Sequence, residues 1–487
     1  GINFFMVGLA DSAVKESQQR VEASLKYFNF KMPRQKVVVN LAPADIRKEG
    51  SAYDLAIAVC VLQASDQLNT KHNLEEYVIM GELSLDGRLR PIKGVLPIAI
   101  EARKQGFKGF ILPAENAHEA AIVNNIDVIP VETLADAIAF LEDRLEIIPL
   151  VVDTRDLFLT HQNEYDADFS HVQGQENIKR ALEIAAAGGH NAIMIGPPGA
   201  GKTMLAKRIP SILPPLTLPE ALETTKIHSV AGKLGTHATL VSRRPFRAPH
   251  HSISDAALVG GGSFPQPGEI SLAHHGVLFL DELPEFKRSV LEVMRQPLEE
   301  RKVSISRAKM AVEFPANFML IASMNPCPCG YYNHPDKECV CGPGVVQKYL
   351  NKISGPLLDR IDLHVEITPV SFDQISSTRI SENSAEIRKR VIRAREQQTE
   401  RFLDYKEIYS NAMMPPELVK KICTITDAGK ALLRTAMDRL GLSARAYDRI
   451  LKVSRTIADL ADSEEIKVEH LAEAIQYRSL DRENWAG

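Results

Sequence analysis

The chain has 487 residues, too many for a single hydrophobic core, which predicts two to four domains. Hydrophobic residues make up 45% and charged residues 25%, as in an ordinary globular protein, and no apolar run approaches the roughly 20 residues that span a bilayer. The net charge of −4 excludes a general attraction to nucleic acid, so any such binding has to come from local basic segments.

The cysteine content and the first residues predict the compartment. The six cysteines are few, and "GINFFMVGLA" (1–10) lacks the basic leader and cleavage site of a signal peptide. The chain starts on Gly1 inside an expected strand, which favours a trimmed N-terminus. We therefore expect a cytoplasmic protein with no membrane association, in which clustered thiols bind metal and do not form disulfides.

Residues 1–148 alternate short β-rich runs with helical patterns, which predicts an α+β or α/β domain. "KVVVNLAP" (36–43) and "GFILP" (109–113) are typical of strands, whereas 16–28 and 95–106 carry the apolar spacing of helices. Residues 149–170 combine proline and acids with weak periodicity, which predicts a linker.

The pattern changes at residue 171. Up to residue 367, helical segments alternate with apolar strands such as "HNAIMIG" (190–196) and "GVLFLDE" (276–282), which predicts a parallel sheet with helices on both faces. Residues 368–487 form the last region. From about residue 383 onward its helical patterns are nearly continuous, which predicts a helical C-terminal domain.

A glycine-rich segment follows the first of these strands. "IGPPGAGKT" (195–203) matches G-x-x-x-x-G-K-[ST] and opens a helix, the context that a phosphate-binding loop requires. The glycines let backbone N–H groups wrap phosphates, the lysine reaches the β and γ oxygens, and the threonine hydroxyl ligates Mg²⁺. We predict an ATP and Mg²⁺ site formed by Gly196, Pro197, Pro198, Gly199, Ala200, Gly201, Lys202 and Thr203.

Two acids end the strand "GVLFLDEL" (276–283). We expect Asp281 to hold Mg²⁺ together with Thr203, and Glu282 to orient or deprotonate the attacking water. An acidic strand end is common by itself, but its pairing with a phosphate loop favours catalysis.

These motifs resemble the AAA+ ATPases. The resemblance implies that Asn325, at the end of "FMLIASMN" (318–325), positions the lytic water. It also implies that Arg360 in "GPLLDRIDLHVEI" (355–367) reaches the γ-phosphate of a neighbouring subunit, as in the branch that contains magnesium chelatase. Arg445 in "GLSARAYDRILKVSRT" (441–456) resembles the second sensor of the helical lid. The alternatives are a salt bridge of Arg360 with Asp359 or Asp362, and an ordinary solvated arginine at 445.

Longer segments narrow the resemblance to the ComM/YifB family of magnesium-chelatase-like AAA+ proteins, over essentially the whole chain. They are "VGLADSAVKES" (7–17), "VNLAPADIRKEGSAYDLAIAV" (39–59), "GELSLDGRLRPIKGVLP" (81–97), "RPFRAPHHSISDAALVGGG" (244–262) and "SGPLLDRIDLHVEI" (354–367).

The resemblance implies an α/β fold class: an AAA+ parallel-sheet core with a helical lid, preceded by a Lon-protease-like (ribosomal-protein-S5-like) α+β domain. It also implies a homo-hexameric motor acting on single-stranded or branched DNA, with helicase or branch-migration activity in DNA uptake and recombination. Two alternatives remain: a chelatase-type motor that remodels a protein partner, and an ATP-dependent protease.

The protease alternative depends on residues 1–148. In the Lon-like pattern, "EGSAYDL" (49–55) places Ala52 at the position of the nucleophile, and "IKGVLP" (92–97) places Leu96 at that of the catalytic lysine. Neither side chain can perform covalent catalysis, and Ser51 and Lys93 are displaced along the chain. We therefore expect a catalytically dead domain.

Four cysteines form a C-x-C-x9-C-x-C pattern in "CPCGYYNHPDKECVC" (327–341). Four thiolates suit a tetrahedral structural Zn²⁺, and His334 is close enough in sequence to replace one of them. We predict a Zn²⁺ site beside the ATPase centre, formed by Cys327, Cys329, Cys339 and Cys341; the alternative is four reduced thiols in a loop.

Two acid-free segments are the candidates for DNA contact. Residues 224–254 and "RKVSISRAKM" (301–310) match the helix-2 insert and the pre-sensor hairpin of the resembling branch, which project into the hexamer pore. Basic side chains there track phosphates without reading sequence. The candidates are Arg243, Arg244, Arg247, Lys302, Arg307 and Lys309.

Overall fold

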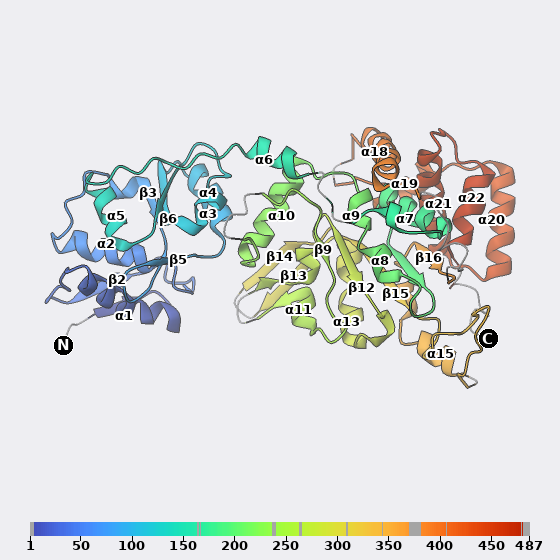
Figure 1. Ribbon diagram of the computed structural model, residues 1–487, viewed down its shortest axis with the longest axis horizontal. Coiled ribbons are helices and arrows are strands. Elements are labelled where there is room, and N and C mark those ends of the chain that lie inside the picture. The colour runs from blue at the N-terminus through green and yellow to red at the C-terminus, as the bar shows by residue number, and fades with distance from the viewer. Residues whose placement is uncertain are drawn as a thin grey trace. The chain divides into compact units, whose positions relative to one another are not determined.

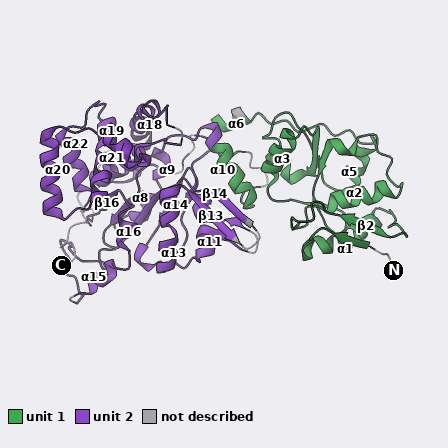
Figure 2. Cartoon of the chain, turned by 180° about the vertical axis from the view of Figure 1, so that it is seen from behind, with its two compact units in different colours: residues 1–161, 221–242 green, residues 162–220, 243–487 purple. Residues whose placement is uncertain are grey.

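The computed structural model describes residues 4–162, 165, 167–235, 240–262, 265–307, 310–342, 344–369, 381–405, 407–478 and 480. The chain forms two compact units (Figure 1; Figure 2), residues 1–161 with 221–242 and residues 162–220 with 243–487. None of the helices in the described part has the length and apolar character that a bilayer crossing requires.

The first unit is built from small sheets and the helices that cover them. Strands β3, β6 and β7 form a parallel three-stranded sheet, β1 and β2 a parallel pair, and β4 and β5 an antiparallel pair. The strands are β1 Phe4–Val7, β2 Val37–Asn40, β3 Tyr77–Ile79, β4 Glu82–Leu83, β5 Leu89–Arg90, β6 Gly109–Pro113 and β7 Asp127–Val131. The helices are α1 Ser12–Tyr27, α2 Asp54–Ala64, α3 Val95–Lys104, α4 Ala117–Ala120, α5 Leu134–Leu141 and α6 Thr154–His161.

The sequence anticipates much of this unit. Strand β6 coincides with the expected strand 109–113, and α3 falls within the expected helix 95–106. One difference lies at 149–170, where the weak periodicity predicts a linker but α6 forms a helix of eight residues.

Residues 221–242, which the sequence assigns to the second region, pack with the first unit instead. They include most of helix α10 Leu218–Val230. The Gly94 amide donates to the Ser229 carbonyl at 3.1 Å, and Leu222 and Leu240 pack against the core formed by α3, β6 and α4. Apolar burial and backbone hydrogen bonding therefore fix this segment to the first unit. The number of basic residues in the segment does not predict either contact.

The second unit contains a five-stranded parallel sheet in the order β16–β8–β15–β12–β9. Alternate residues of β8 enter two different cores: Ala192 and Met194 pack with the C-terminal helices, and Ile193 and Ile195 with the helices on the opposite face. This confirms the predicted parallel sheet with helices on both faces. The strands are β8 Ala192–Ile195, β9 Phe246–Arg247, β12 Val277–Leu280, β15 Met319–Met324 and β16 Leu363–Glu366.

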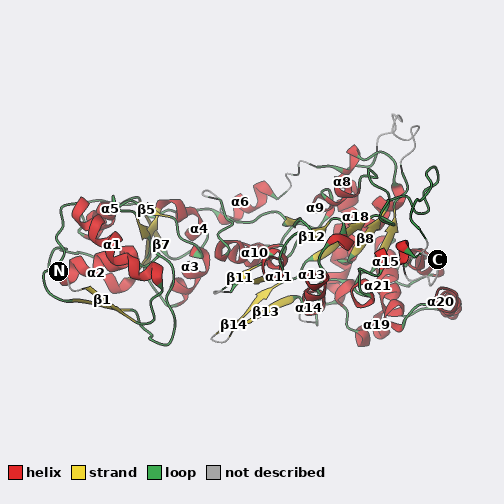
Figure 3. Ribbon diagram, turned by 90° about the horizontal axis from the view of Figure 1, so that it is seen from below, coloured by secondary structure: helices red, strands yellow, loops and turns green. Residues whose placement is uncertain are grey.

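Short helices and two hairpins complete the region up to residue 367. Strands β13 Lys302–Arg307 and β14 Met310–Pro315 form an antiparallel hairpin (Figure 3), and β10 Gly260–Gly261 pairs with β11 Gln266–Pro267. The helices are α7 Glu176–Gly188, α8 Lys202–Ala206, α9 Ile209–Ile212, α11 Asp255–Val259, α12 Glu269–Leu272, α13 Arg288–Val293, α14 Arg295–Glu300, α15 Val345–Leu350 and α16 Gly355–Leu358.

Helices dominate the C-terminal part, as the sequence predicts. They are α18 Ser384–Arg401, α19 Pro416–Ile422, α20 Asp427–Leu440, α21 Ala444–Leu460 and α22 Val468–Gln476. Helices α18 and α21 pack on α7, and their apolar faces join the core on that side of the sheet. The buried Asp459 of α21 accepts hydrogen bonds from Arg401 of α18 at 2.6 and 2.9 Å, which ties these two helices together.

Candidate nucleotide site

The phosphate-loop segment joins buried strand β8 to helix α8. Gly199 and Gly201 both have a φ of +80°, a backbone conformation that glycine adopts without strain. A Cβ added at Gly199 would meet no atom within 4 Å, whereas one at Gly196 would lie 2.7 Å from the Ile367 carbonyl oxygen. The loop is therefore packed tightly on β16 at its start and open at its tip, where a phosphate chain would lie.

Lys202 spans this loop. Its Nζ donates to the carbonyl oxygens of Gly196 (2.7 Å) and Pro197 (2.9 Å) and to Oδ1 of Asn325 (3.0 Å). Burial lowers the pKa of Lys202, although Asp281 and Glu282 act to raise it. A buried ammonium held by neutral acceptors can exchange them for phosphate oxygens with a gain in electrostatic energy.

The two acids lie at the adjacent strand end. Thr203 Oγ1 donates to Asp281 Oδ2 at 2.7 Å, so the two predicted Mg²⁺ ligands are already paired. The Ser323 hydroxyl contacts Asp281 Oδ1 and holds the carboxylate from the other side. Hydroxyl and carboxylate oxygens are the ligands that Mg²⁺ prefers, so this pair fits the ion.

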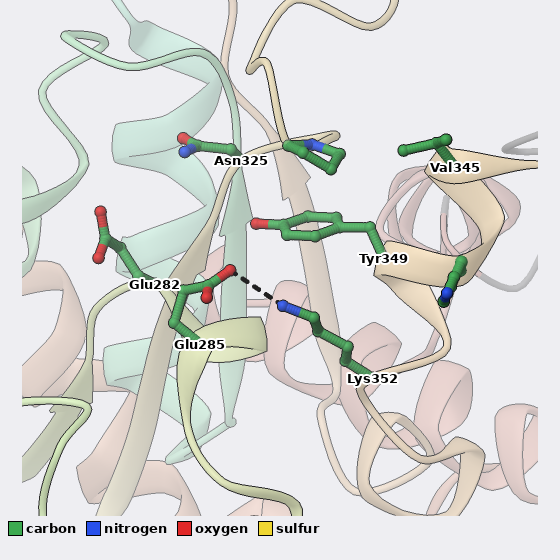
Figure 4. A pocket seen from close by; sticks show the side chains of 8 residues that line it. Glu282, Glu285, Asn325, Val345, Tyr349 and Lys352 are labelled. Atoms are coloured by element: carbon green, nitrogen blue, oxygen red, sulfur yellow. Dashed lines mark hydrogen bonds and ion pairs between the residues drawn. The ribbon is translucent and has the colours of Figure 1, made fainter. Parts of the chain in front are cut away.

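Glu282 adopts a φ of +55°, uncommon for a residue with a side chain, and lines an open pocket of about 380 Å³. Figure 4 shows Glu282 and Asn325 on the same side of this pocket, with the Tyr349 hydroxyl directed toward them. Across it, Lys352 Nζ lies 3.2 Å from Glu285 Oε1. Burial, with the charges of Glu285 and Glu282, raises the pKa of Tyr349 above its usual value, so the hydroxyl stays a hydrogen-bond donor even at basic pH.

The sequence alone missed several residues of this site. His251 Nδ1 lies 3.7 Å from Glu282 Oε2, Ser323 contacts Asp281, and Tyr349 and Lys352 line the pocket. Ser323 could have been found from the sequence, because it lies at the end of β15, two residues before the candidate residue Asn325. Tyr349 and Lys352 come from a segment beyond the cysteine loop and carry no local signal.

Arg360 lies away from this pocket. It follows α16, is 8% exposed, and donates to the Pro356 carbonyl and the Glu299 carboxylate. It lines a separate pocket with Glu299 and Glu300. The chain therefore does not bring Arg360 to its own phosphate loop, and neither Asp359 nor Asp362 is its partner.

Arg445 stands in the first turn of α21, where its guanidinium bonds Asp359 at 3.1 Å. Its side chain is 68% exposed, so this surface pair contributes little stability. The structure thus links the lid helix to the segment that carries Arg360, not to the phosphate loop directly.

The four cysteines converge. The Sγ atoms of Cys327 and Cys329 are 3.3 Å apart, Cys339 lies 3.7 and 3.6 Å from them, and Cys341 Sγ falls within 4.8 Å of all three. Burial acts to raise the pKa of Cys329, but hydrogen bonds from the Tyr331 backbone and the Cys327 thiol outweigh it and lower the pKa to about 6.

His334 does not join this group of thiols. Its Nδ1 accepts hydrogen bonds from the Asp336 and Lys337 amides at 3.0 and 3.1 Å. The donor set is thus four sulfurs, which suits Zn²⁺. A Cβ added at Gly330 would lie 2.6 Å from Pro198 Cδ, so the cysteine loop closes directly onto the phosphate loop.

The predicted DNA contacts differ in their surroundings. Arg244 donates to the Pro214 and His275 carbonyls at 2.5 and 2.7 Å, and Arg247 binds Glu269 through two bonds of 2.6 and 2.7 Å. Arg243 is exposed. Lys302 pairs with Glu313 across the hairpin at 2.9 Å. The side chain of Arg307 and all of Lys309 lie outside the described residues.

The first unit places the Lon-like positions as follows. Leu96 is fully buried in α3, and Ala52 packs against the apolar core to which Leu96 belongs. The Ser51 hydroxyl contacts the Glu82 carboxylate, and the Lys93 side chain packs against Gly232. Ser51 therefore has a carboxylate partner, and the Lys93 stem packs on a glycine of the same unit.

Three family models match the chain. The model described as magnesium chelatase, subunit ChlI, matches residues 168–375; subunit ChlI of Mg-chelatase matches 1–116; and the ChlI C-terminal model matches 381–478.

Full-length relatives cover nearly the whole chain. Competence protein ComM of Haemophilus influenzae is 44% identical over 482 residues, 98% of this chain and 92% of its own length. The YifB proteins of Salmonella typhimurium and Escherichia coli are 45% and 43% identical, each over 98% of this chain and 92% of their own length.

The thiol cluster predicts a metal. Purified protein should contain about one Zn²⁺ per chain, because four thiolates close a tetrahedral structural site. Cys339→Ser should lose most of the zinc, whereas Cys60→Ser, which removes an exposed thiol elsewhere, should keep it. Metal analysis by mass spectrometry measures both, and a fully folded, active protein without zinc would disprove the site.

Proposed function

The chain belongs to the ComM/YifB family of magnesium-chelatase-like AAA+ proteins, and from this we propose that it is an ATP-hydrolysing motor that acts on DNA as a ring of six copies. The observation that carries the proposal is the convergence of Lys202, Thr203, Asp281, Glu282 and Asn325 at one edge of the parallel sheet.

Each side chain has a task in hydrolysis that its position supports. Backbone amides of the loop and Lys202 would bind the phosphates, and Thr203 and Asp281 would hold Mg²⁺, which would neutralise charge that develops on the phosphate oxygens. Glu282 accepts a proton from the attacking water, and Asn325 orients that water from the neighbouring strand.

Asn325 also contacts Lys202 at 3.0 Å. When the γ-phosphate leaves, Lys202 would donate again to Oδ1 of Asn325. The side chain at the end of β15 would therefore differ between the ATP-bound and the ADP-bound site. The same contact restrains Lys202 when no phosphate is present.

Action on DNA rests on the relatives and on the hairpin. One full-length relative is named as a competence protein, which favours a role in DNA uptake and recombination for this chain as well. Strand β13 of the hairpin begins at Lys302 and ends at Arg307, and Lys309 follows two residues later in the sequence. Of the two acid-free segments, this is the better candidate, because Arg244 and Arg247 are more buried in their contacts within the chain, whereas the Lys302 side chain stays 45% exposed in its pair with Glu313.

The second candidate function is remodelling of a protein partner in the manner of a chelatase motor. The ChlI family models favour it, since they match three segments of the chain. A protease is disfavoured, because Ala52 and Leu96 supply neither a nucleophile nor a base.

DNA dependence of the ATPase rate separates these functions. We expect single-stranded or branched DNA to raise the rate, and the triple change Lys302→Ala, Arg307→Ala, Lys309→Ala to weaken this stimulation and its salt dependence, because fewer phosphates are neutralised. Lys389→Ala with Lys430→Ala removes two exposed lysines of the C-terminal helices and should change neither. A rate that no DNA structure alters would favour the protein-remodelling function.

Hydrolysis should depend on Glu282 after binding is complete. Glu282→Gln should bind ATP and Mg²⁺ yet turn over at least ~100-fold more slowly, the scale for losing a positioned acid–base group. Glu285→Gln alters a carboxylate of the same pocket that pairs with Lys352, so it should stay within a few fold of the unaltered chain. Single-turnover hydrolysis and nucleotide binding measure the two steps, and near-normal turnover in Glu282→Gln would exclude its role.

Arg360 should act between subunits. Arg360→Ala should bind ATP but hydrolyse it about 10³-fold more slowly, the scale of an arginine finger. Mixing it with Lys202→Ala should restore some activity, because some interfaces then pair an intact loop with an intact arginine. Arg295→Ala, which changes another arginine lining the same pocket, should need no such rescue. No recovery in mixed rings of confirmed mass would contradict action between subunits.

A further inference from the structure

A small pocket of about 70 Å³ lies at the edge of the sheet opposite the phosphate loop. Gly189, Gly276 and Phe318 line it, and they precede strands β8, β12 and β15, whereas the phosphate loop, Asp281 and Asn325 follow the same strands. Helix α18 and residues 409–413 form its other wall. The pocket belongs entirely to the second unit and is separate from the nucleotide site.

Three arginines line this pocket. Arg244 donates to the carbonyl oxygens of Pro214 and His275. Arg301 donates to the Phe318 carbonyl at 3.0 Å. Arg395 of α18 donates to the Tyr409 and Ala186 carbonyls at 3.3 and 3.2 Å, and its buried Nε has no hydrogen-bond partner among the described residues.

The charges of the side chains that line the pocket do not balance. Glu220 is the carboxylate in its lining; it lies 3.4 Å from Arg244 and 3.5 Å from His275. Asp362, a buried acid outside the lining whose charge acts on Arg301, is engaged by Arg449 at 2.9 Å and by His190 at 3.2 Å. The carbonyl oxygens satisfy hydrogen bonds but carry no net charge, so three guanidinium groups face one carboxylate.

This excess of positive charge is costly in a small pocket. Burial lowers the pKa of Arg395 to about 10, with a further contribution from Arg244, and burial also lowers the pKa of Arg301. Both side chains still remain charged at neutral pH, because the guanidinium group deprotonates only under strongly basic conditions. A bound anion would offset the repulsion and accept a hydrogen bond from the orphaned Nε of Arg395.

We propose that this pocket binds a phosphate-class oxoanion through Arg244, Arg301 and Arg395. Its volume suits one compact tetrahedral anion or several waters, at roughly 10–15 Å³ per water, and is too small for a nucleotide. Arginine presents paired donors to such an anion. The pocket joins the sheet edge to α18, so an anion there would tie the C-terminal helices to the core independently of the nucleotide.

Equilibrium dialysis with radiolabelled inorganic phosphate at fixed ionic strength tests the site. The chain carrying Lys202→Ala serves as background, because this change weakens phosphate binding at the nucleotide loop. We expect saturable binding in this background and a loss of at least ~10-fold in affinity on adding Arg395→Gln, since one charge-assisted hydrogen bond is removed. Arg393→Gln, on the same helix but exposed and paired with Asp462, should leave the binding unchanged.

A second variant is expected to strengthen phosphate binding, an effect that poor folding cannot produce. Glu220→Gln removes the negative charge next to Arg244 and should tighten phosphate binding by ~3-fold or more. Displacement of label by sulfate alone identifies a free ion as the occupant, whereas displacement by a short oligothymidylate identifies a nucleic-acid phosphate; each supports a phosphate site. Absence of saturable binding, or equal binding by Arg395→Gln and Arg393→Gln, would overturn the proposal.

Discussion

The register of strand β8 is the constraint on which the candidate site depends. Its last residue, Ile195, is aligned with Met324 of β15 on one side and with Glu366 of β16 on the other. Because the three strands are parallel, Gly196 and Asn325 leave the sheet at the same level, and Lys202 reaches both. A shift by one residue would turn the side chains of β8 to opposite faces and break two cores at once.

Asp362 connects this sheet to the C-terminal helices. The carboxylate is 1% exposed; it accepts hydrogen bonds from the Asn191 amide and from Arg449 of α21 and contacts His190. Burial alone would raise the pKa of Asp362, but Arg449 and His190 outweigh it and hold the pKa far below its usual range. Replacing Arg449 would leave a buried charge poorly compensated, so this pair holds α21 against the start of β16.

The sequence predicts what depends on local pattern. Strand β6, helix α3 and the glycine-rich turn between β8 and α8 each follow from a few consecutive residues, because periodicity and glycine spacing are local properties. It does not predict what depends on distant partners. Tyr349 and Lys352 join the pocket from a segment that follows the cysteine loop, and residues 221–242 pack with the first unit because Ser229 and Leu222 find partners there.

The basic residues illustrate the same limit in electrostatic terms. A run without acids suggests a surface for nucleic acid, yet Arg244 and Arg247 are occupied by carbonyl oxygens and by Glu269, a carboxylate 22 residues away in sequence. A guanidinium group has five donors and no acceptor, so it can satisfy structure and ligand at once. The net charge of a sequence segment therefore predicts anion binding less well than the balance of arginine donors and carboxylates that line the same pocket. By that measure the imbalance lies at the edge of the sheet opposite the nucleotide site.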